Sequence, residues 1–149
     1  MLTIDAFKAA RSVLNGVILN TGLIYSPACS KATGNSVYIK PENMQITGAY
    51  KIRGAYYKIS TLTDEQKKRG LVTASAGNHA QGVAYAAQRA GVPATVIMPT
   101  TTPLVKVNNT KDYGAKVVLH GATFDDAAEL ASHLSETEGL TYIHPFNDL

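Results

Sequence analysis

The feature that most constrains the fold is a set of four short apolar runs, spaced at nearly even intervals along the second half of the chain. A segment with a helical pattern lies between each run and the next. A strand–helix–strand order of this kind predicts right-handed βαβ units that share one parallel sheet. We therefore predict the α/β class, with an open parallel four-stranded sheet and flanking helices. The strands are expected at 71–74, 94–98, 116–120 and 140–144.

The segments between these runs have ordinary helix boundaries. The first, at 78–90, is rich in alanine and is followed by glycine and proline, which stop helices. The second, at 103–113, starts with proline and is followed by glycine, as is typical of helix ends. The third, at 123–136, has Thr123 as its expected N-cap and two aspartates in its first turn. Each segment is thus predicted to be one helix.

The first part of the chain has a less regular pattern. Thr3 can cap a helix that glycine ends at position 16, and two short strands are expected at 17–19 and 36–39. Neither strand has an obvious partner in the chain, although natural proteins avoid unpaired strand edges. Further on, Thr63 begins a capping-box sequence that predicts one short helix before the sheet.

The stretch 40–55, KPENMQITGAYKIRGA, holds a lysine in an unusual setting. Gly48 and Gly54 bracket Lys51 and leave room for a bulky group near the backbone. Apolar residues at helical spacing place Lys51 in the first turn of a helix, where a cation meets the positive end of the helix dipole and Arg53 adds repulsion. Both effects favour a neutral amine, the form that Schiff-base chemistry needs. Without these neighbours, Lys51 would be read as a surface lysine.

A second candidate element, SAGNHAQG at 75–82, follows the first predicted sheet strand. Ligands of open α/β sheets bind at this end of the strands. Gly77 lets the backbone approach a ligand, and the N–H groups that open the next helix form an anion site with the Ser75 hydroxyl. A polar loop without a ligand is an equally common reading. His79 is as readily a hydrogen bonder at a helix start as an acid or base.

Composition argues against several other classes of protein. The net charge is +3 over 149 residues, and the only basic run, 67–69, ends a short helix, so nucleic-acid binding has little support. The single Cys29 cannot form an internal disulfide, and no apolar run or leader-like start suggests a membrane or secretion, so we expect a cytoplasmic protein. The histidines lack metal-ligand spacing, and no metal site is expected.

Taken together, 40–55 and 73–87 (TASAGNHAQGVAYAA) resemble the pyridoxal-phosphate (PLP) enzymes of fold type II, the tryptophan synthase β-like family. Within that family the resemblance is closest to the threonine dehydratases (threonine ammonia-lyases), with serine racemase and serine dehydratase as near relatives. The stretches 96–127 and 142–148 resemble the same group. The resemblance covers essentially the whole chain and implies a PLP cofactor, a small amino-acid substrate such as threonine or serine, and a homo-oligomer.

The resemblance also implies roles for individual residues. Lys51 would bond covalently to PLP and, once released by substrate, remove the α-proton; Tyr50 stands beside it where the family usually has phenylalanine. Asn78 would hydrogen-bond the phenolic oxygen of PLP. Ser75, Gly77, Asn78 and His79 would hold the substrate carboxylate. The implied reaction converts L-threonine into 2-oxobutanoate and ammonia.

By the same resemblance, 1–44 is the amino-terminal piece of a large domain, 45–144 is a small α/β domain, and 145–149 begins the return to the large domain. The family holds the PLP phosphate in a glycine-rich loop, and this sequence contains no Gly-Gly pair. We therefore expect an incomplete, amino-terminal portion of the enzyme that binds PLP weakly and has little or no activity. The alternatives are a serine dehydratase or serine racemase of the same fold, a noncatalytic small-domain module, and a mononucleotide-binding domain.

Overall fold

The computed structural model describes residues 3–147. The outermost residues of the expected 1–44 and 145–149 segments, 1–2 and 148–149, lie outside the described residues. A parallel four-stranded sheet with the order β5-β4-β3-β6 stands at the centre, which confirms the predicted sheet. Its strands are β3 (Leu71–Ala74), β4 (Ala94–Met98), β5 (Lys116–Leu119) and β6 (Thr141–Tyr142).

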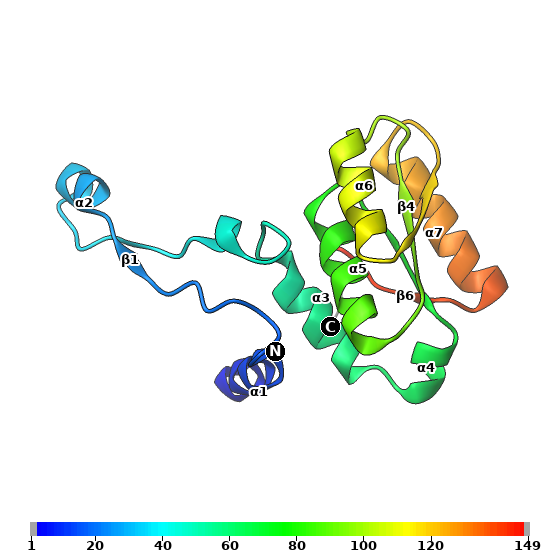
Figure 1. Ribbon diagram of the computed structural model, residues 1–149, viewed down its shortest axis with the longest axis horizontal. Coiled ribbons are helices and arrows are strands. Elements are labelled where there is room, and N and C mark those ends of the chain that lie inside the picture. The colour runs from blue at the N-terminus through cyan, green and yellow to red at the C-terminus, as the bar shows by residue number, and fades with distance from the viewer. Residues whose placement is uncertain (1–2, 148–149) are drawn as a thin grey trace.

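Helices cover both faces of this sheet (Figure 1). α5 (Asn78–Ala90) and α6 (Leu104–Asp112) lie on one face, and α7 (Phe124–Glu138) lies on the other. One apolar cluster joins α5 and α6 to alternate strand residues, and a second joins α7 to the residues between them. Because the central strands are buried on both faces, they read as continuous apolar runs.

The expected helix starts are confirmed at both threonine caps. Thr63 forms a capping box with Gln66 at the start of α4 (Asp64–Lys68), and Thr123 forms one with Asp126 at the start of α7. The Asp126 carboxylate accepts hydrogen bonds from the backbone N–H groups of Thr123 and Ala122, which lower its pKa. The first helix, α1 (Ile4–Leu14), is capped by Thr3. α1 ends two residues before Gly16, the glycine that was expected to stop this helix.

The order of the strands reverses between β3 and β6. The chain passes outward from β3 to β4 and β5, and α7 then carries it back so that β6 pairs with the other edge of β3. The Thr73 hydroxyl, at the end of β3, donates to the Ile143 carbonyl just after β6 (2.7 Å). The carboxyl ends of β3 and β6 therefore form the topological switch point, where open α/β sheets bind ligands.

Residues 15–50, called the arm below, extend away from residues 51–147, called the body (Figure 1). The arm contains β1 (Ile24–Tyr25), α2 (Pro27–Thr33), β2 (Tyr38–Ile39) and the 3-10 turn η1 (Glu42–Met44). β1 and β2 form an antiparallel pair.

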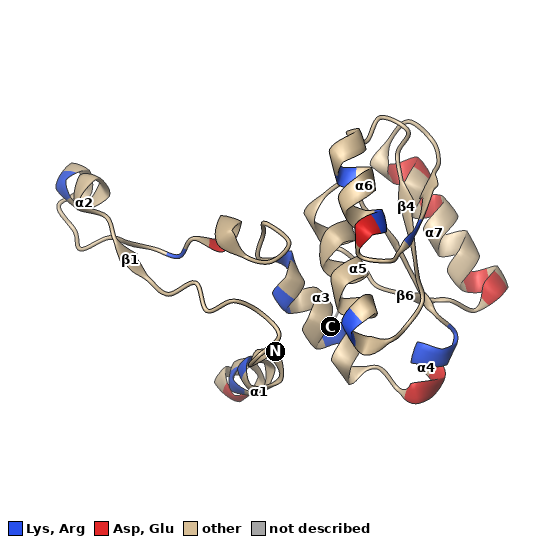
Figure 2. Ribbon diagram, in the orientation of Figure 1, with Lys and Arg blue, Asp and Glu red and all other residues tan. Residues whose placement is uncertain are grey.

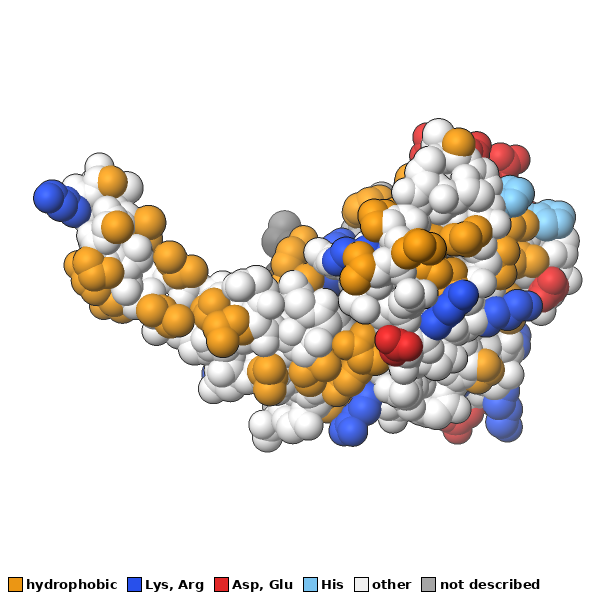
Figure 3. Space-filling model, turned by 45° about the horizontal axis from the view of Figure 1, so that its top comes forward, with side chains coloured by type: hydrophobic (Ala, Val, Ile, Leu, Met, Phe, Trp, Pro, Cys, Tyr) orange, Lys and Arg blue, Asp and Glu red, His pale blue; other side chains and the backbone are white. Residues whose placement is uncertain are grey.

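Two predictions for the arm are wrong. The segment 17–19 is a loop, in which the Val17 and Ile18 amides donate to the Leu14 carbonyl at the end of α1. The strand near 36–39 is shorter than expected, and it has a partner, Ile24–Tyr25, that sequence reasoning missed. Both strands are exposed on both faces, so neither shows the alternation of apolar and polar residues by which a half-buried strand is recognised. Apolar side chains spread along the arm surface (Figure 3).

Within residues 3–147, none of the helices combines the length and the apolar character that crossing a membrane would require.

Candidate functional site

Lys51 is the first residue of α3 (Lys51–Thr61), as predicted. Its ammonium Nζ donates to the Pro145 carbonyl oxygen at 2.8 Å, and it lies 5.2 Å from the centre of the Phe146 ring and 5.9 Å from that of Tyr50. α3 has no acidic residue in its first turn, and its ribbon in Figure 2 carries the blue of Lys and Arg positions. A carbonyl and two rings therefore surround the amine, and among the described residues no carboxylate forms an ion pair with it.

The space expected around Lys51 is present. A Cβ built on Gly48 or Gly54 would meet no other atom within 4 Å, and Gly48 has the positive φ of +69° that favours glycine. The amine opens into a broad groove lined by α1, α3 and residues 143–146. Tyr50, which precedes the helix, is 61% exposed, so its ring is available to a flat ligand and is not part of the core.

Sequence reasoning missed Gly82, which brings the two candidate elements together. A Cβ at Gly82 of α5 would lie 3.2 Å from the Lys51 carbonyl carbon and from the Ile52 amide nitrogen, so the two helices touch at the start of α3. Asn78 lies four residues before Gly82, on the same face of α5. This contact therefore places the Lys51 end of α3 about one helical turn from the loop that follows β3.

The loop after β3 has the features of an anion site. Gly77 is the N-cap of α5, no side chain caps the helix, and its first turn contains no acidic residue. The Ser75 hydroxyl accepts a hydrogen bond from the Gly77 amide (3.2 Å). A carboxylate would be a suitable ligand for the uncapped N–H groups at this helix start.

His79 and Asn78 differ in what their side chains contact. His79 is only 7% exposed, and its Nε2 lies 3.1 Å from the Thr73 hydroxyl and 3.3 Å from the Ile143 carbonyl, between β3 and β6. Its imidazole is thus a hydrogen-bonding group inside the fold, which leaves its backbone as the part that can face a carboxylate. Asn78 is exposed, and its Oδ1 accepts a hydrogen bond from Lys106 Nζ (3.2 Å).

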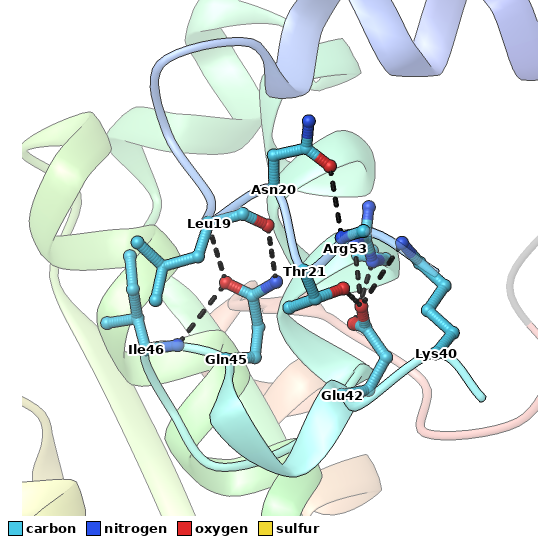
Figure 4. Close-up of polar contacts among 9 residues, drawn as sticks. Leu19, Asn20, Thr21, Lys40, Glu42, Gln45, Ile46 and Arg53 are labelled. Carbon is cyan, nitrogen blue, oxygen red and sulfur yellow. Dashed lines mark hydrogen bonds and ion pairs between the residues drawn. The ribbon is translucent and has the colours of Figure 1, made fainter. Parts of the chain in front are cut away.

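The expectation that Arg53 repels the Lys51 amine needs correction. Arg53 forms a bidentate pair with Glu42, from Nε to Oε2 at 2.8 Å and from Nη2 to Oε1 at 2.7 Å (Figure 4). The hydrogen bonds from Arg53, with a further one from the Thr21 hydroxyl, lower the pKa of Glu42 to about 2. The guanidinium charge is therefore balanced by a carboxylate from the arm. No local spacing pattern could have shown this pairing.

The two candidate elements meet at the switch point. Ser75 follows β3, and Pro145, which accepts the Lys51 hydrogen bond, follows the neighbouring strand β6. Both lie beyond the carboxyl ends of adjacent parallel strands, where ligands of such sheets bind. The amine of the candidate lysine, Lys51, thus lies near an uncapped helix start.

These groups fit the reactive end of PLP. A primary amine in an open groove can bond to its aldehyde, and an exposed asparagine can hydrogen-bond its ring oxygen. The phosphate needs several oriented donors. Among the described residues, the starts of α5 and α6 at this edge both lack a side-chain cap, and that of α5, beside Ser75, suits a substrate carboxylate. Groups of three or more potential metal ligands are absent from residues 3–147. The arrangement of Lys51 and the loop after β3 therefore fits a lysine-dependent carbonyl chemistry.

Comparison with known proteins agrees with this class. The family model described as "Pyridoxal-phosphate dependent enzyme" matches residues 14–149, and the chain belongs to that family.

Individual members of the family show which enzymes the chain is similar to. The chain is 51% identical, over 99% of its length, to "L-threonine ammonia-lyase" of Thermotoga maritima, and it covers 37% of that protein. It matches the structure of the processed form of threonine deaminase isoform 2 from Solanum lycopersicum with a TM-score of 0.86 and 41% identity, covering 99% of this chain and 42% of that one. The structure of maize serine racemase matches with a TM-score of 0.90 and 35% identity, over 97% of this chain and 44% of that one. The chain thus spans less than half the length of each of these relatives.

Proposed function

We propose that this chain supplies the lysine and the carboxylate-binding loop of a PLP-dependent threonine ammonia-lyase, which converts L-threonine into 2-oxobutanoate and ammonia. The observation that carries the proposal is the position of Lys51 Nζ, held by Pro145 at the switch point beside the uncapped start of α5. The relatives named for threonine chemistry share 51% and 41% identity with the chain, and the serine racemase shares 35%. That ranking favours threonine elimination over the racemase alternative.

Each group in this chain has a definite task in the proposed reaction. When bound, PLP supplies an electron sink for the substrate α-carbon. Lys51, as the neutral amine, takes the α-proton on the lone pair of Nζ, which its N–H bond to the Pro145 carbonyl leaves free. The Ser75 hydroxyl and the backbone N–H groups of Gly77, Asn78 and His79 hold the carboxylate, for which the Gly77 amide exchanges its bond to Ser75 Oγ. The threonine hydroxyl then takes up a proton and leaves as water. Hydrolysis of the resulting enamine consumes one water and releases ammonia.

The same proposal extends to the surroundings of the site. We propose a small domain over 45–144, with 1–44 and 145–149 belonging to a larger one, because the arm carries few buried apolar residues of its own. A homo-oligomer and a cytoplasmic location are proposed on the family resemblance and on the single cysteine, Cys29.

Reductive trapping tests the role of Lys51. The chain is mixed with PLP over a range of concentrations, treated with borohydride and digested, and the labelled lysines are counted by mass spectrometry. We expect labelling at Lys51 to exceed that at Lys58, which lies on the same helix and in the same groove. Lys51→Ala removes the strongest label, and Lys58→Ala leaves it unchanged.

The outcome that overturns the proposal is equal labelling of the two lysines at every PLP concentration. Turnover of L-threonine is followed in parallel by the appearance of 2-oxobutanoate. We expect little or none from this chain, and a rate that Lys51→Ala abolishes would show that it forms a complete active site by itself.

A further inference from the structure

α5 and α6 make a regular series of side-chain contacts that begins at the candidate site. Lys106 Nζ donates to Asn78 Oδ1 (3.2 Å), and Asn109 Nδ2 donates to Gln81 Oε1 (3.4 Å), and the partners are 28 positions apart in each pair. Packing of this kind between two parallel helices fixes their register. The contact between Lys106 and Asn78 therefore follows from how the two helices pack.

The position of Lys106 has no explanation in helix stability. It is the third residue of α6, and the first turns of α6 and α5 contain no acidic residue. An ammonium near the positive ends of two helix dipoles is destabilising, and in the described part of the chain Lys106 has no ion-pair partner. Local rules are broken mainly where function requires it. Lys51 breaks the same rule at the start of α3.

The chemistry of the two side chains determines how the Asn78 amide is turned. An ammonium has only donors, whereas a carboxamide has an acceptor oxygen and a donor NH2 group. Lys106 can therefore bond only the oxygen of Asn78, so the Nδ2 donor must point away from the lysine. In that orientation, Nδ2 can donate to an oxygen of a ligand in front of the loop.

We propose that Lys106 is a positioning residue, which holds the Asn78 amide with its Nδ2 donor turned toward the PLP ring oxygen. This inference rests on the proposed function, which assigns Asn78 to that oxygen. Without the ammonium, the carboxamide can rotate about its Cβ–Cγ bond and present an oxygen, which would repel the electron-rich oxygen of the ligand. The Asn78 donor is then available for only part of the time.

The first test measures the Asn78 amide itself and needs no ligand. Nitrogen-15 relaxation gives the order parameter of the Asn78 Nδ2 group in the wild-type chain and in Lys106→Met, Lys106→Arg and Lys111→Met. Lys111 is the matched control, because it is an exposed lysine on the same helix. Only in the Lys106→Met variant do we expect the Asn78 side chain to become as mobile as the exposed Asn108 side chain. Equal order parameters in Lys106→Met and Lys111→Met would overturn the inference.

The second test asks whether the orientation matters for PLP. We expect Lys106→Met to raise the PLP concentration needed for half-maximal trapping at Lys51 by about as much as Asn78→Ala does, with no further loss in the double variant. Lys106→Arg, which keeps a cationic donor, is expected to recover most of the loss. Additive effects in the double variant would contradict a role that acts through Asn78.

The two tests separate the two proposals. Absence of selective labelling at Lys51 in the wild-type chain would count against the proposed function, and the Asn78 order parameter would still decide the role of Lys106. Selective labelling that is equal in Lys106→Met and Lys111→Met would leave the proposed function standing and remove the inference.

Discussion

The body and the arm are held together by different kinds of interaction. In the body, two apolar clusters fill both sides of the sheet, and residues such as Ile52, Val72 and Val96 are completely buried. In the arm, the strands are exposed on both faces, and its most buried side chain, Gln45, is polar. The body is thus stabilised by burial of apolar surface, whereas the arm depends on a small number of directed polar contacts.

Two polar residues hold the arm together, and one of them also binds the arm to the start of α3. Gln45 binds the backbone of Leu19 twice, as an acceptor at 2.8 Å and as a donor at 2.9 Å, in the manner of a strand partner. Glu42 binds Arg53 and the Thr21 hydroxyl (Figure 4). Since Arg53 lies two residues after Lys51, this ion pair ties the arm to the helix that carries the candidate lysine.

The largest effect is expected in the body, from a substitution at the contact between α3 and α5. Gly82→Val would place its side chain against the backbone of Lys51 and Ile52, at the 3.2 Å contacts described above. We expect it to lower the free energy of unfolding by about 1–3 kcal/mol, since overpacking forces neighbouring backbone apart. Thermal unfolding measures the change.

Gly54→Val is the matched control for Gly82→Val, because Gly54 also lies in a helix but has open space around it. Its melting temperature should equal or exceed that of the wild-type chain. A Gly82→Val variant as stable as Gly54→Val would mean that the two helices do not touch at this point.

A smaller and more local effect is expected in the arm. Gln45→Ala removes both hydrogen bonds to Leu19, which we expect to cost about 0.5–1.5 kcal/mol of local stability, because Leu19 is half exposed and water can replace the lost partner. Amide hydrogen exchange should accelerate over 17–21 and at η1, while the amides of β3 and β4 keep their protection. Gln88→Ala, at an exposed position of α5, serves as the control. Faster exchange throughout the body would show that arm and body unfold as one unit.

The smallest effect concerns pH. The pKa of Glu42 is lowered from 4.5 to about 2 by its bonds to Arg53 and Thr21. A carboxyl whose pKa is lower in the folded state stabilises that state above its unfolded pKa, and the contribution is lost as the pH falls. We therefore expect the attachment of the arm to weaken between about pH 4.5 and pH 2. The Arg53 Nε–H signal, followed by NMR during acid titration, reports it.

Glu42→Gln provides the comparison for this titration. It keeps a hydrogen-bond acceptor but has no carboxylate to protonate, so the Arg53 signal should no longer change over this range. A wild-type midpoint near pH 4.5 would show that the pair does not form in solution.

The contrast between body and arm also explains what could be predicted. The sheet strands, the helices between them and the caps at Thr63 and Thr123 follow from periodicity and local hydrogen bonding, and all of them are found. The helix start at Lys51 and the loop at Ser75 were recognised for the same reason. The strand expected at 17–19 was not found. A short apolar run does not by itself show that a segment is buried in a sheet.

What sequence alone determined is the α/β class, the family resemblance and the identity of Lys51 and Asn78 as candidate residues, since these depend on local patterns and on recognisable motifs. Only the tertiary structure decided that Gly82 joins α3 to α5, that Pro145 holds the Lys51 amine, that Glu42 balances Arg53, and that Lys106 binds Asn78. These contacts join residues that are far apart in the chain, and their partners are set by how helices and strands pack. A period of 2 or 3.6 residues carries no information about them.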